Sequence, residues 1–177
     1  QIQHTSVPTT LKTRVYGNQS QVVRFDRETT STLENSEQTI FCHHLSSHSN
    51  KYDFIVVADY AKGMITREIQ RTLTEFSHSG PPLFIDPSSK TPSTWKNPFA
   101  IKPNWNEACH FAEINPVNSS ELQEMSFRKK LLRHLQTLWE PQHLLVTLGP
   151  EGLLHQERNQ QATWIPSEAK EVYDVSG

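Results

Sequence analysis

Apolar and polar residues alternate along the first part of the chain, and this pattern predicts a β-hairpin. The alternation runs through residues 11–15 and returns at 23–25, with Gly17-Asn18 between the two runs. A two-residue period is typical of strands, and Gly and Asn favour the tight turn of a hairpin. Basic residues fall on both strands and could form a cluster on one face, in a register that sequence alone leaves open: Lys12, Arg14 and Arg24.

The pattern changes after a polar stretch in which we expect a short helix over residues 36–44, followed by a loop. Phe54–Ala58 is a continuous apolar run rich in β-branched residues, which is typical of a strand buried on both faces of a parallel sheet. Apolar residues then recur at helical spacing, with Thr66 as the N-cap and Gly80 as the stop signal. They are Ile65, Ile69, Leu73 and Phe76.

Further strands and one more helix complete the pattern. Strands are predicted at 83–85, 99–101 and 144–146, and apolar residues spaced from Leu122 to Leu138 predict the helix between the last two. Alternating strands and helices predict a layered α/β fold with right-handed crossovers. The length of 177 residues favours one domain with a single core.

A polar segment follows each predicted strand, and these segments define the candidate site. In an open parallel sheet, ligands bind beyond the carboxyl ends of the strands. We therefore expect the following segments to meet in space: Asp59–Gly63, Asp86–Ser88, Lys102–Asn104 and Thr147–Gly149.

Composition excludes several classes of function. The formal net charge is −2, so the chain has no basic field for nucleic acid or an anionic membrane surface. Its two cysteines lack zinc-site spacing and favour a reducing compartment. No apolar run approaches the roughly 20 residues of a bilayer span. We expect a cytoplasmic protein, and a chain that begins without Met or a basic leader indicates part of something longer.

The segment Asn104–Glu107 follows a strand and opens a helix, whose positive dipole end would face the site. Asn104 could contact a phosphate oxygen, and Glu107 could hold Mg²⁺ through water. The alternative is structural, because Asn104 could simply cap the helix while Glu107 completes a capping box.

Two other segments could contact phosphate groups. Thr147–Gly152 offers a hydroxyl and two glycines that allow close backbone approach, although a plain hairpin turn would use the same residues. Asp174–Gly177 could begin a Gly-rich turn that cradles a phosphoryl group with backbone N–H groups. The alternative for this second segment is an ordinary frayed chain end.

Taken together, these motifs resemble those of the ribokinase-like carbohydrate kinases. The Asn-x-x-Glu motif, the Thr-x-Gly-x-x-Gly turn and the Asp-x-Ser-Gly start of the family's Asp-Thr-x-Gly-Ala-Gly-Asp signature occur in the family's order. Within the family, the sequence resembles the D-glycero-D-manno-heptose 7-phosphate kinases of ADP-heptose synthesis. The residues that carry this resemblance are Pro8–Val15, Asn18-Gln19, Arg24–Glu28, Val57–Gly63, Ile85–Pro87, Pro103-Asn104 and Glu171–Gly177.

The resemblance implies a fold and a substrate side. The fold would be a three-layer α/β sandwich, present here in part, with residues 9–28 as a β-hairpin lid inserted in a kinase domain over 29–177. The lid would also form a homodimer. The implied substrate-binding residues, with solvated charge as the alternative for those on the lid, are Lys12, Arg14, Arg24, Asp59, Lys62 and Asp86.

The resemblance also implies cofactors. Glu107 would hold Mg²⁺ through water, Asp174 would lie near a monovalent-cation site for K⁺, and Gly177 would begin the anion hole. The implied ATP-binding residues are Asn104, Trp105, Asn106, Glu107, Thr147, Gly149 and Gly152.

Departures from the family pattern affect the substrate loop and the catalytic end. Ser88 and Ser89 precede Lys90 where relatives place Lys soon after Asp-Pro, and Ala58 and Ala61 replace the usual Ser and Gly. The family's general base, an Asp three residues beyond the terminal glycine of this chain, is not in the sequence. We therefore expect the intact protein to be the enzyme and this chain alone to be inactive.

The implied reaction is transfer of the γ-phosphate of ATP to the C1 hydroxyl of the heptose phosphate. Three alternatives stay open: a ribokinase-like kinase for another sugar, a non-catalytic dimerisation or binding module on the kinase scaffold, and an α/β domain that binds some other nucleotide.

Overall fold

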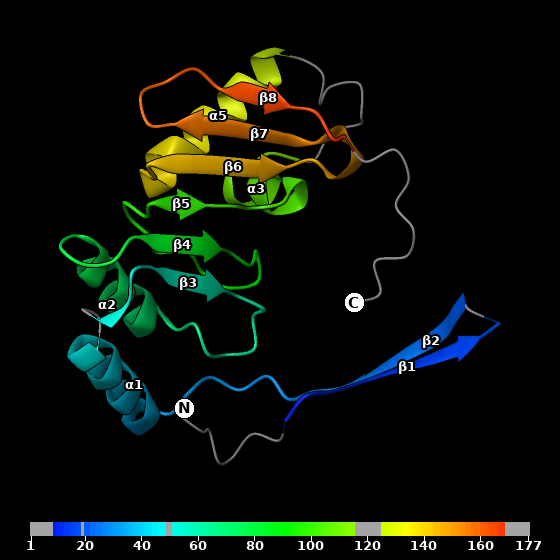
Figure 1. The fold of residues 1–177 in the computed structure, drawn as a ribbon, viewed down its shortest axis with the longest axis vertical. Helices are drawn as coiled ribbons and strands as arrows, with labels where there is room; N and C mark the ends of the chain where they lie inside the picture. Colours follow the sequence, from blue (N-terminus) through cyan, green and yellow to red (C-terminus); the bar gives the residue numbers. More distant parts are fainter. Residues whose placement is uncertain (1–8, 19, 49–50, 116–124, 169–177) are drawn as a thin grey trace.

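A six-stranded mixed sheet forms the centre of the computed structural model, which describes residues 9–18, 20–48, 51–115 and 125–168 (Figure 1). The strands lie in the sheet in their chain order, the first four parallel and the last two antiparallel. They are β3 (Ile55–Ala58), β4 (Leu83–Asp86), β5 (Ala100–Ile101), β6 (His143–Thr147), β7 (Leu153–Glu157) and β8 (Thr163–Ile165).

Helices connect β3 to β4 and β5 to β6, as the alternating pattern predicts, whereas a loop without a helix connects β4 to β5. Thr66 caps α2 by accepting a hydrogen bond from Ile69 N at 3.3 Å, which confirms the predicted helix start. The helix expected at 36–44 is present but longer, since it runs from Asn35 to His48. The helices are α1 (Asn35–His48), α2 (Arg67–Ser77), α3 (Trp105–Phe111) and α5 (Met125–Trp139).

The core lies between one face of the sheet and the helices α2, α3 and α5 (Figure 1). Alternate strand residues point into it, and Leu131, Leu135 and Trp139 of α5 are fully buried against them. Phe111 of α3 packs edge-on against Trp139, with ring centroids 5.0 Å apart. The buried strand residues are Val57, Leu83, Ile85, Ile101, Leu144, Val146 and Leu154.

The prediction that Phe54–Ala58 is buried on both faces is wrong. Val57 is 5% exposed, whereas its neighbour Val56 is 62% exposed and Phe54 is 58% exposed. The strand lies at the edge of the sheet, and the described helices pack against one face only. A continuous apolar run shows that both faces of a strand carry apolar side chains, but it does not show which face is covered by other elements.

A separate two-stranded sheet precedes the body of the molecule and consists of β1 (Leu11–Gly17) and β2 (Ser20–Arg27). This hairpin confirms the two-residue period and projects away from the body, beyond the ends of the parallel strands (Figure 1). A register shift between Val15 and Tyr16 marks a β-bulge before the turn. None of the helices in the described ranges combines the length and apolar character needed to cross a membrane.

Candidate functional site

The parallel strands end at one edge of the sheet, and the predicted polar segments meet there. Asp59 N donates to Asp86 O at 3.0 Å, which joins the segments after β3 and β4. Asn104 forms a parallel bridge with Thr147, and Thr147 N donates to Pro103 O at 3.1 Å. Residues 43 positions apart in sequence are thereby neighbours. The expectation that these segments meet is confirmed.

The segment after β3 forms a tight turn. One carboxylate oxygen of Asp59 accepts a hydrogen bond from Ala61 N at 2.7 Å, and Ala61 adopts a positive φ of 53°. Lys62 then forms an ion pair with Glu28, which lies just beyond β2. This ion pair connects the base of the hairpin to the edge of the sheet, so the predicted substrate residue Lys62 has a partner inside the protein.

Gly63 explains why the hairpin connection can lie so close to this turn. Its φ is +89°, and a Cβ placed on it would lie 1.9 Å from Ser31 O. Leu33 N also donates to Gly63 O at 3.3 Å. Only glycine combines this backbone conformation with such a close approach, so the residue fixes where the hairpin leaves the body.

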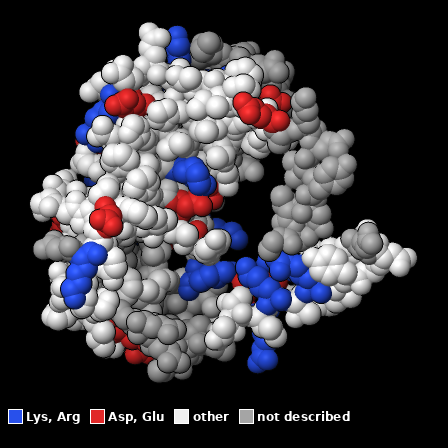
Figure 2. Space-filling model, viewed as in Figure 1, with Lys and Arg blue, Asp and Glu red and all other residues white. Residues whose placement is uncertain are grey.

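Basic side chains lie on one face of the hairpin, as the sequence allowed. Lys12 pairs with Asp26 and Arg14 pairs with Arg24 in the strand register. Arg24 donates two hydrogen bonds to Asp26, at 2.7 and 2.6 Å, and these bonds lower the pKa of Asp26 and raise that of Arg24. Figure 2 shows Lys and Arg gathered along the hairpin and the adjoining edge of the body. Three cations and one carboxylate leave this face positive.

The direct pairing of Arg14 with Arg24 favours an anion between them, because like charges in opposed positions repel. Either side chain could bind a phosphate through charge-assisted hydrogen bonds, although at Arg24 the phosphate would compete with Asp26. The described hairpin therefore presents a cationic face whose chemistry suits a phosphorylated ligand.

On the other side of the site, Asn104 and Glu107 form a capping box at the start of α3. Asn104 Oδ1 accepts from Glu107 N at 3.0 Å, and Glu107 Oε2 accepts from Asn104 N at 2.8 Å. The structural reading of this motif is thus confirmed. Trp105 packs near Phe127 of α5, with ring centroids 5.8 Å apart, and Asn106 is exposed.

The segment Thr147–Gly152 makes the turn between β6 and β7, as its structural reading predicted. A short 3₁₀ helix, η2 (Gly149–Glu151), fills the turn. Gly152 adopts a φ of +97°, and a Cβ on it would lie 2.1 Å from Ile165 O. A Cβ on Gly149 would have no neighbour within 4 Å, so the backbone there is open to approach. The predicted site residues Asp174 and Gly177 lie outside the described residues.

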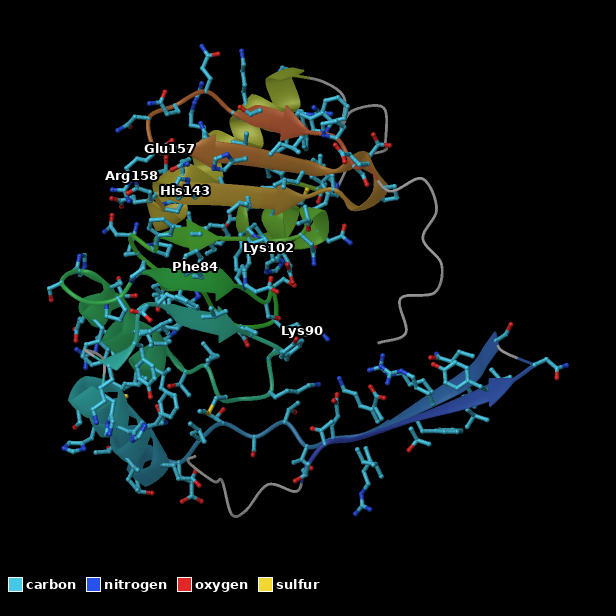
Figure 3. All side chains as sticks on the ribbon, in the orientation of Figure 1. Phe84, Lys90, Lys102, His143, Glu157 and Arg158 are labelled. Atoms are coloured by element: carbon cyan, nitrogen blue, oxygen red, sulfur yellow. The ribbon has the colours of Figure 1, made fainter. Side chains whose placement is uncertain are left out.

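Lys102 is a residue of this edge that the sequence reasoning placed in a segment but did not single out. Its Nζ lies 2.9 Å from Asp86 Oδ1, and the two side chains are 47% and 49% exposed. Figure 3 shows Lys102 and Lys90 toward the end of the sheet where the parallel strands finish, with His143 toward the opposite end. The position of Lys102 directly after a predicted strand was the only sign in the sequence that it could belong to the site.

Carboxylates and cations thus alternate across the site. Asp59 and Asp86 could accept hydrogen bonds from sugar hydroxyls, while the hairpin cations could bind an anionic group on the same molecule. Within the described ranges, no group of three or more His, Cys, Asp or Glu side chains is arranged to hold a metal ion directly.

The chain is similar in sequence to the bifunctional HldE proteins. It is 32% identical over 170 residues to HldE of a Nitratiruptor species, covering 96% of this chain and 34% of the relative. It is 31% identical over 174 residues to HldE of Helicobacter hepaticus, covering 98% and 35%. The chain therefore spans about a third of the length of these relatives. No protein-family model matches the sequence.

Solved structures with the same fold include two kinases. The tetrameric inhibited form of phosphofructokinase-2 from Escherichia coli has a TM-score of 0.67 at 14% identity, covering 92% of this chain and 51% of that one. Ribokinase from Giardia lamblia has a TM-score of 0.62 at 13% identity, covering 94% and 50%. At such low identity these likenesses establish the fold.

The chain therefore has the ribokinase-like α/β fold. Over nearly its whole length, its sequence is similar to one segment of the bifunctional HldE proteins.

Proposed function

We propose that the chain is part of an ATP-dependent sugar kinase that phosphorylates the C1 hydroxyl of D-glycero-D-manno-heptose 7-phosphate in ADP-heptose synthesis. The observation that carries the proposal is the meeting of Asp59 and Asp86 with Asn104 and Thr147 at one edge of the parallel sheet. A phosphoryl-transfer enzyme needs its two substrates held end to end at such an edge. The similarity to HldE supports the choice of sugar.

The substrate would lie between the hairpin and the sheet. Lys12, Arg14 and Arg24 share one face of the hairpin and would bind the 7-phosphate. Asp59, Lys62 and Asp86 would contact the sugar hydroxyls from the sheet side. Glu28 competes for Lys62, so substrate binding would exchange that ion pair for contacts with the sugar.

The nucleotide would lie over the start of α3 and the turn after β6. Asn104, the backbone of Trp105 and Asn106, Thr147, Gly149 and Gly152 would surround the phosphates, and the open space at Gly149 suits this approach.

Glu107 fits a role in Mg²⁺ binding through water, because the capping box uses its Oε2 and not its Oε1. Bound Mg²⁺ would neutralise charge on the β- and γ-phosphates. A potassium complex of phosphofructokinase-2 from Escherichia coli, which shares the fold, supports the use of K⁺, and we propose Asp174 as a residue near its site. The anion hole beginning at Gly177 and the general base beyond it belong to the same proposal.

A homodimer through the hairpin is part of this proposal. The face opposite Lys12, Arg14 and Arg24 is mainly apolar, with Thr13 and Arg27 also on it. Leu11, Val15 and Phe25 on this face are 58%, 42% and 61% exposed. A two-stranded sheet is marginally stable alone in water, so a second hairpin would stabilise it by covering this face. We take residues 9–28 as the lid and 29–177 as part of the kinase domain, in a cytoplasmic protein that binds neither membrane nor nucleic acid.

The proposal is tested with the full-length protein. We expect ATP-dependent turnover of heptose 7-phosphate and little turnover of ribose or fructose phosphates. Asn104→Ser keeps an N-cap oxygen but removes the amide, whereas Asn104→Ala removes both. Loss of ATP affinity in Asn104→Ser without loss of stability supports a nucleotide role. No turnover of the heptose phosphate contradicts the proposal.

Two alternatives to the heptose phosphate kinase are each supported by a separate observation. Turnover of another sugar phosphate would indicate a different ribokinase-like kinase, as the fold shared with phosphofructokinase-2 allows. The capping box and the β6–β7 turn account structurally for Asn104, Glu107 and Gly152, which favours a non-catalytic binding or dimerisation module. The gene sequence after Gly177 would distinguish a kinase from a non-catalytic module. Ala-Gly-Asp at the next three positions supports a kinase, and another residue in place of that Asp supports the module. A domain for some other nucleotide would bind ATP equally after replacement of Asn104 and Glu107.

A further inference from the structure

Lys102 lies where the two halves of the proposed site meet. Its backbone N donates to Ile85 O at 2.8 Å, which extends the pairing of β4 with β5 by one residue. Two residues later, Asn104 bridges to Thr147 on the nucleotide side. The backbone is therefore fixed at Lys102 and again two residues later. The Cα of Lys102 lies between the proposed substrate-side and nucleotide-side residues.

The side chain of Lys102 is turned toward the substrate side. Its Nζ lies 2.9 Å from Asp86 Oδ1, and about half of each side chain is exposed. Exposed pairs of this kind contribute little net stability, so an incoming anion can compete with the carboxylate for the ammonium group. The ion pair with Asp86 thus positions the Lys102 ammonium group and leaves it accessible to a ligand.

The other described charges near this edge are differently engaged. Lys62 pairs with Glu28 at the base of the hairpin, and Asp59 uses one carboxylate oxygen for the Ala61 N–H. Lys90 lies on the loop after β4 and is exposed. Lys102 is thus a cation held against the sheet itself, so its position does not depend on how the hairpin moves.

We infer that Lys102 contacts the phosphoryl group during its transfer, an inference that rests on the proposed function. In this step the bond between the γ-phosphorus and its bridging oxygen to the β-phosphate breaks, and a bond to the sugar oxygen forms. The hydroxyl proton would pass to the general base of the proposed function, an Asp that would follow Gly177. Lys102 stays protonated and donates to the phosphoryl oxygens, where charge concentrates in the transition state. Asp86, once released, accepts a hydrogen bond from a sugar hydroxyl.

A purely structural role is the competing explanation, in which the ion pair only ties β4 to β5. The chain offers a matched control, because Lys96 forms a similar exposed pair with Glu140 at 3.0 Å. The Lys96 and Glu140 side chains are 49% and 53% exposed, close to the values for Lys102 and Asp86. This control pair joins the segment before β5 to the end of α5, outside the proposed site.

The first experiment uses the 177-residue chain and inorganic pyrophosphate, with affinity measured by isothermal titration calorimetry. We expect Lys102→Met to weaken binding about tenfold, Lys102→Arg to keep most of the affinity, and Lys96→Met to match the wild type. Equal affinities for Lys102→Met and Lys96→Met, or no pyrophosphate binding by the wild type, would overturn the inference.

The second experiment measures activity of the full-length protein and separates this inference from the proposed function. We expect Lys102→Met to lower kcat/KM for ATP about 10²-fold through both kcat and KM, because the contact with the bound phosphate strengthens in the transition state. If the wild type transfers no phosphate to any sugar phosphate, the proposed function fails. If the wild type is active and Lys102→Met has the kcat of Lys96→Met, the inference about Lys102 fails and the proposed function stands.

Discussion

Arg24 and Asp26 show how a single pair can limit what a residue is free to bind. Arg24 is a proposed phosphate ligand, yet it donates two hydrogen bonds to the carboxylate two positions along its own strand. A phosphate must compete with that carboxylate. The cationic character of the hairpin face therefore rests on the surplus of cations over Asp26, more than on any one arginine.

The pKa of Asp26 tests this geometry. The hydrogen bonds from Arg24 hold it below the ordinary value of 3.8, and Lys12 and Arg14 lower it further by smaller amounts. The stabilisation is thus present above pH 3.8 and is lost as pH falls through the lowered pKa. We expect carboxyl NMR titration to return the pKa toward 3.8 in Arg24→Gln and to raise it less in Arg14→Gln. Equal effects of the two substitutions would contradict the paired geometry.

Gly63 provides a second test at the level of one residue. Alanine there would combine a φ of +89° with a Cβ only 1.9 Å from Ser31 O, so the hairpin connection would have to move. We expect Gly63→Ala to lower the free energy of unfolding in urea by more than about 2 kcal/mol.

Gly149→Ala is the control for this strain. Its φ of +61° is also left-handed, but nothing lies within 4 Å of the added carbon. Its cost should therefore be the conformational part alone, roughly 1–2 kcal/mol. A Gly63→Ala variant no less stable than this control would show that the close approach to Ser31 is absent in solution.

Among the elements, α2 is fixed to the following loop by a buried polar residue. Gln70 is fully buried, and its amide donates to Pro92 O at 2.9 Å while accepting from Thr94 N at 2.8 Å. Gln70→Leu keeps the volume but leaves these loop groups without their partner. We expect it to lower the free energy of unfolding by roughly 1–3 kcal/mol, measured in urea.

Arg71→Ala serves as the control on the same helix. Arg71 pairs with Glu68 and Glu75 at the exposed surface, where ion pairs contribute little, so stability should hardly change. If Arg71→Ala lowered the free energy of unfolding more than Gln70→Leu, the surface ion pairs and not the buried Gln70 would stabilise α2.

Helices and strands could be predicted well from sequence, because their signals are local. Thr66 caps α2, the turn that joins β1 to β2 follows Gly17, and Asn104 caps α3 with its capping box. The reach of α1 to His48 exceeded its prediction, since the polar residues after His44 carry no apolar period to mark a helix.

At the scale of the whole molecule, the sheet presents one apolar face that the described helices leave uncovered. A hollow of about 550 Å³ on this face is lined mainly by apolar side chains, including those of Phe54, Val56, Phe84 and Leu145. Exposed apolar area of this kind marks a surface of contact, so the chain alone should bind hydrophobic dyes.

Adjacent valines on β3 test which face is covered. Val57 is 5% exposed and Val56 is 62% exposed. We expect Val57→Ala to lower the free energy of unfolding by roughly 1.5–3 kcal/mol, because it removes buried methyl groups and leaves a cavity. Val56→Ala should cost less than about 0.5 kcal/mol and should reduce dye binding. Similar costs at the two positions, measured in urea, would mean that both faces of the strand are buried.

The candidate site was predictable as a set of segments but not as a set of contacts. Sequence placed polar residues after each parallel strand, and that arrangement is confirmed at Asp59, Asp86, Asn104 and Thr147. Lys102 was not singled out, because its significance depends on a carboxylate 16 positions earlier in the chain.

The sequence by itself determined the hairpin, the four parallel strands, their helices and their order, because these follow from periodicity and capping residues within a few positions. It did not predict β8. Only the tertiary structure decided which sheet face the helices cover, that Arg14 lies opposite Arg24, and that Lys102 meets Asp86. These features depend on contacts between segments distant in the chain, whose free energies come from packing and register rather than from any local pattern.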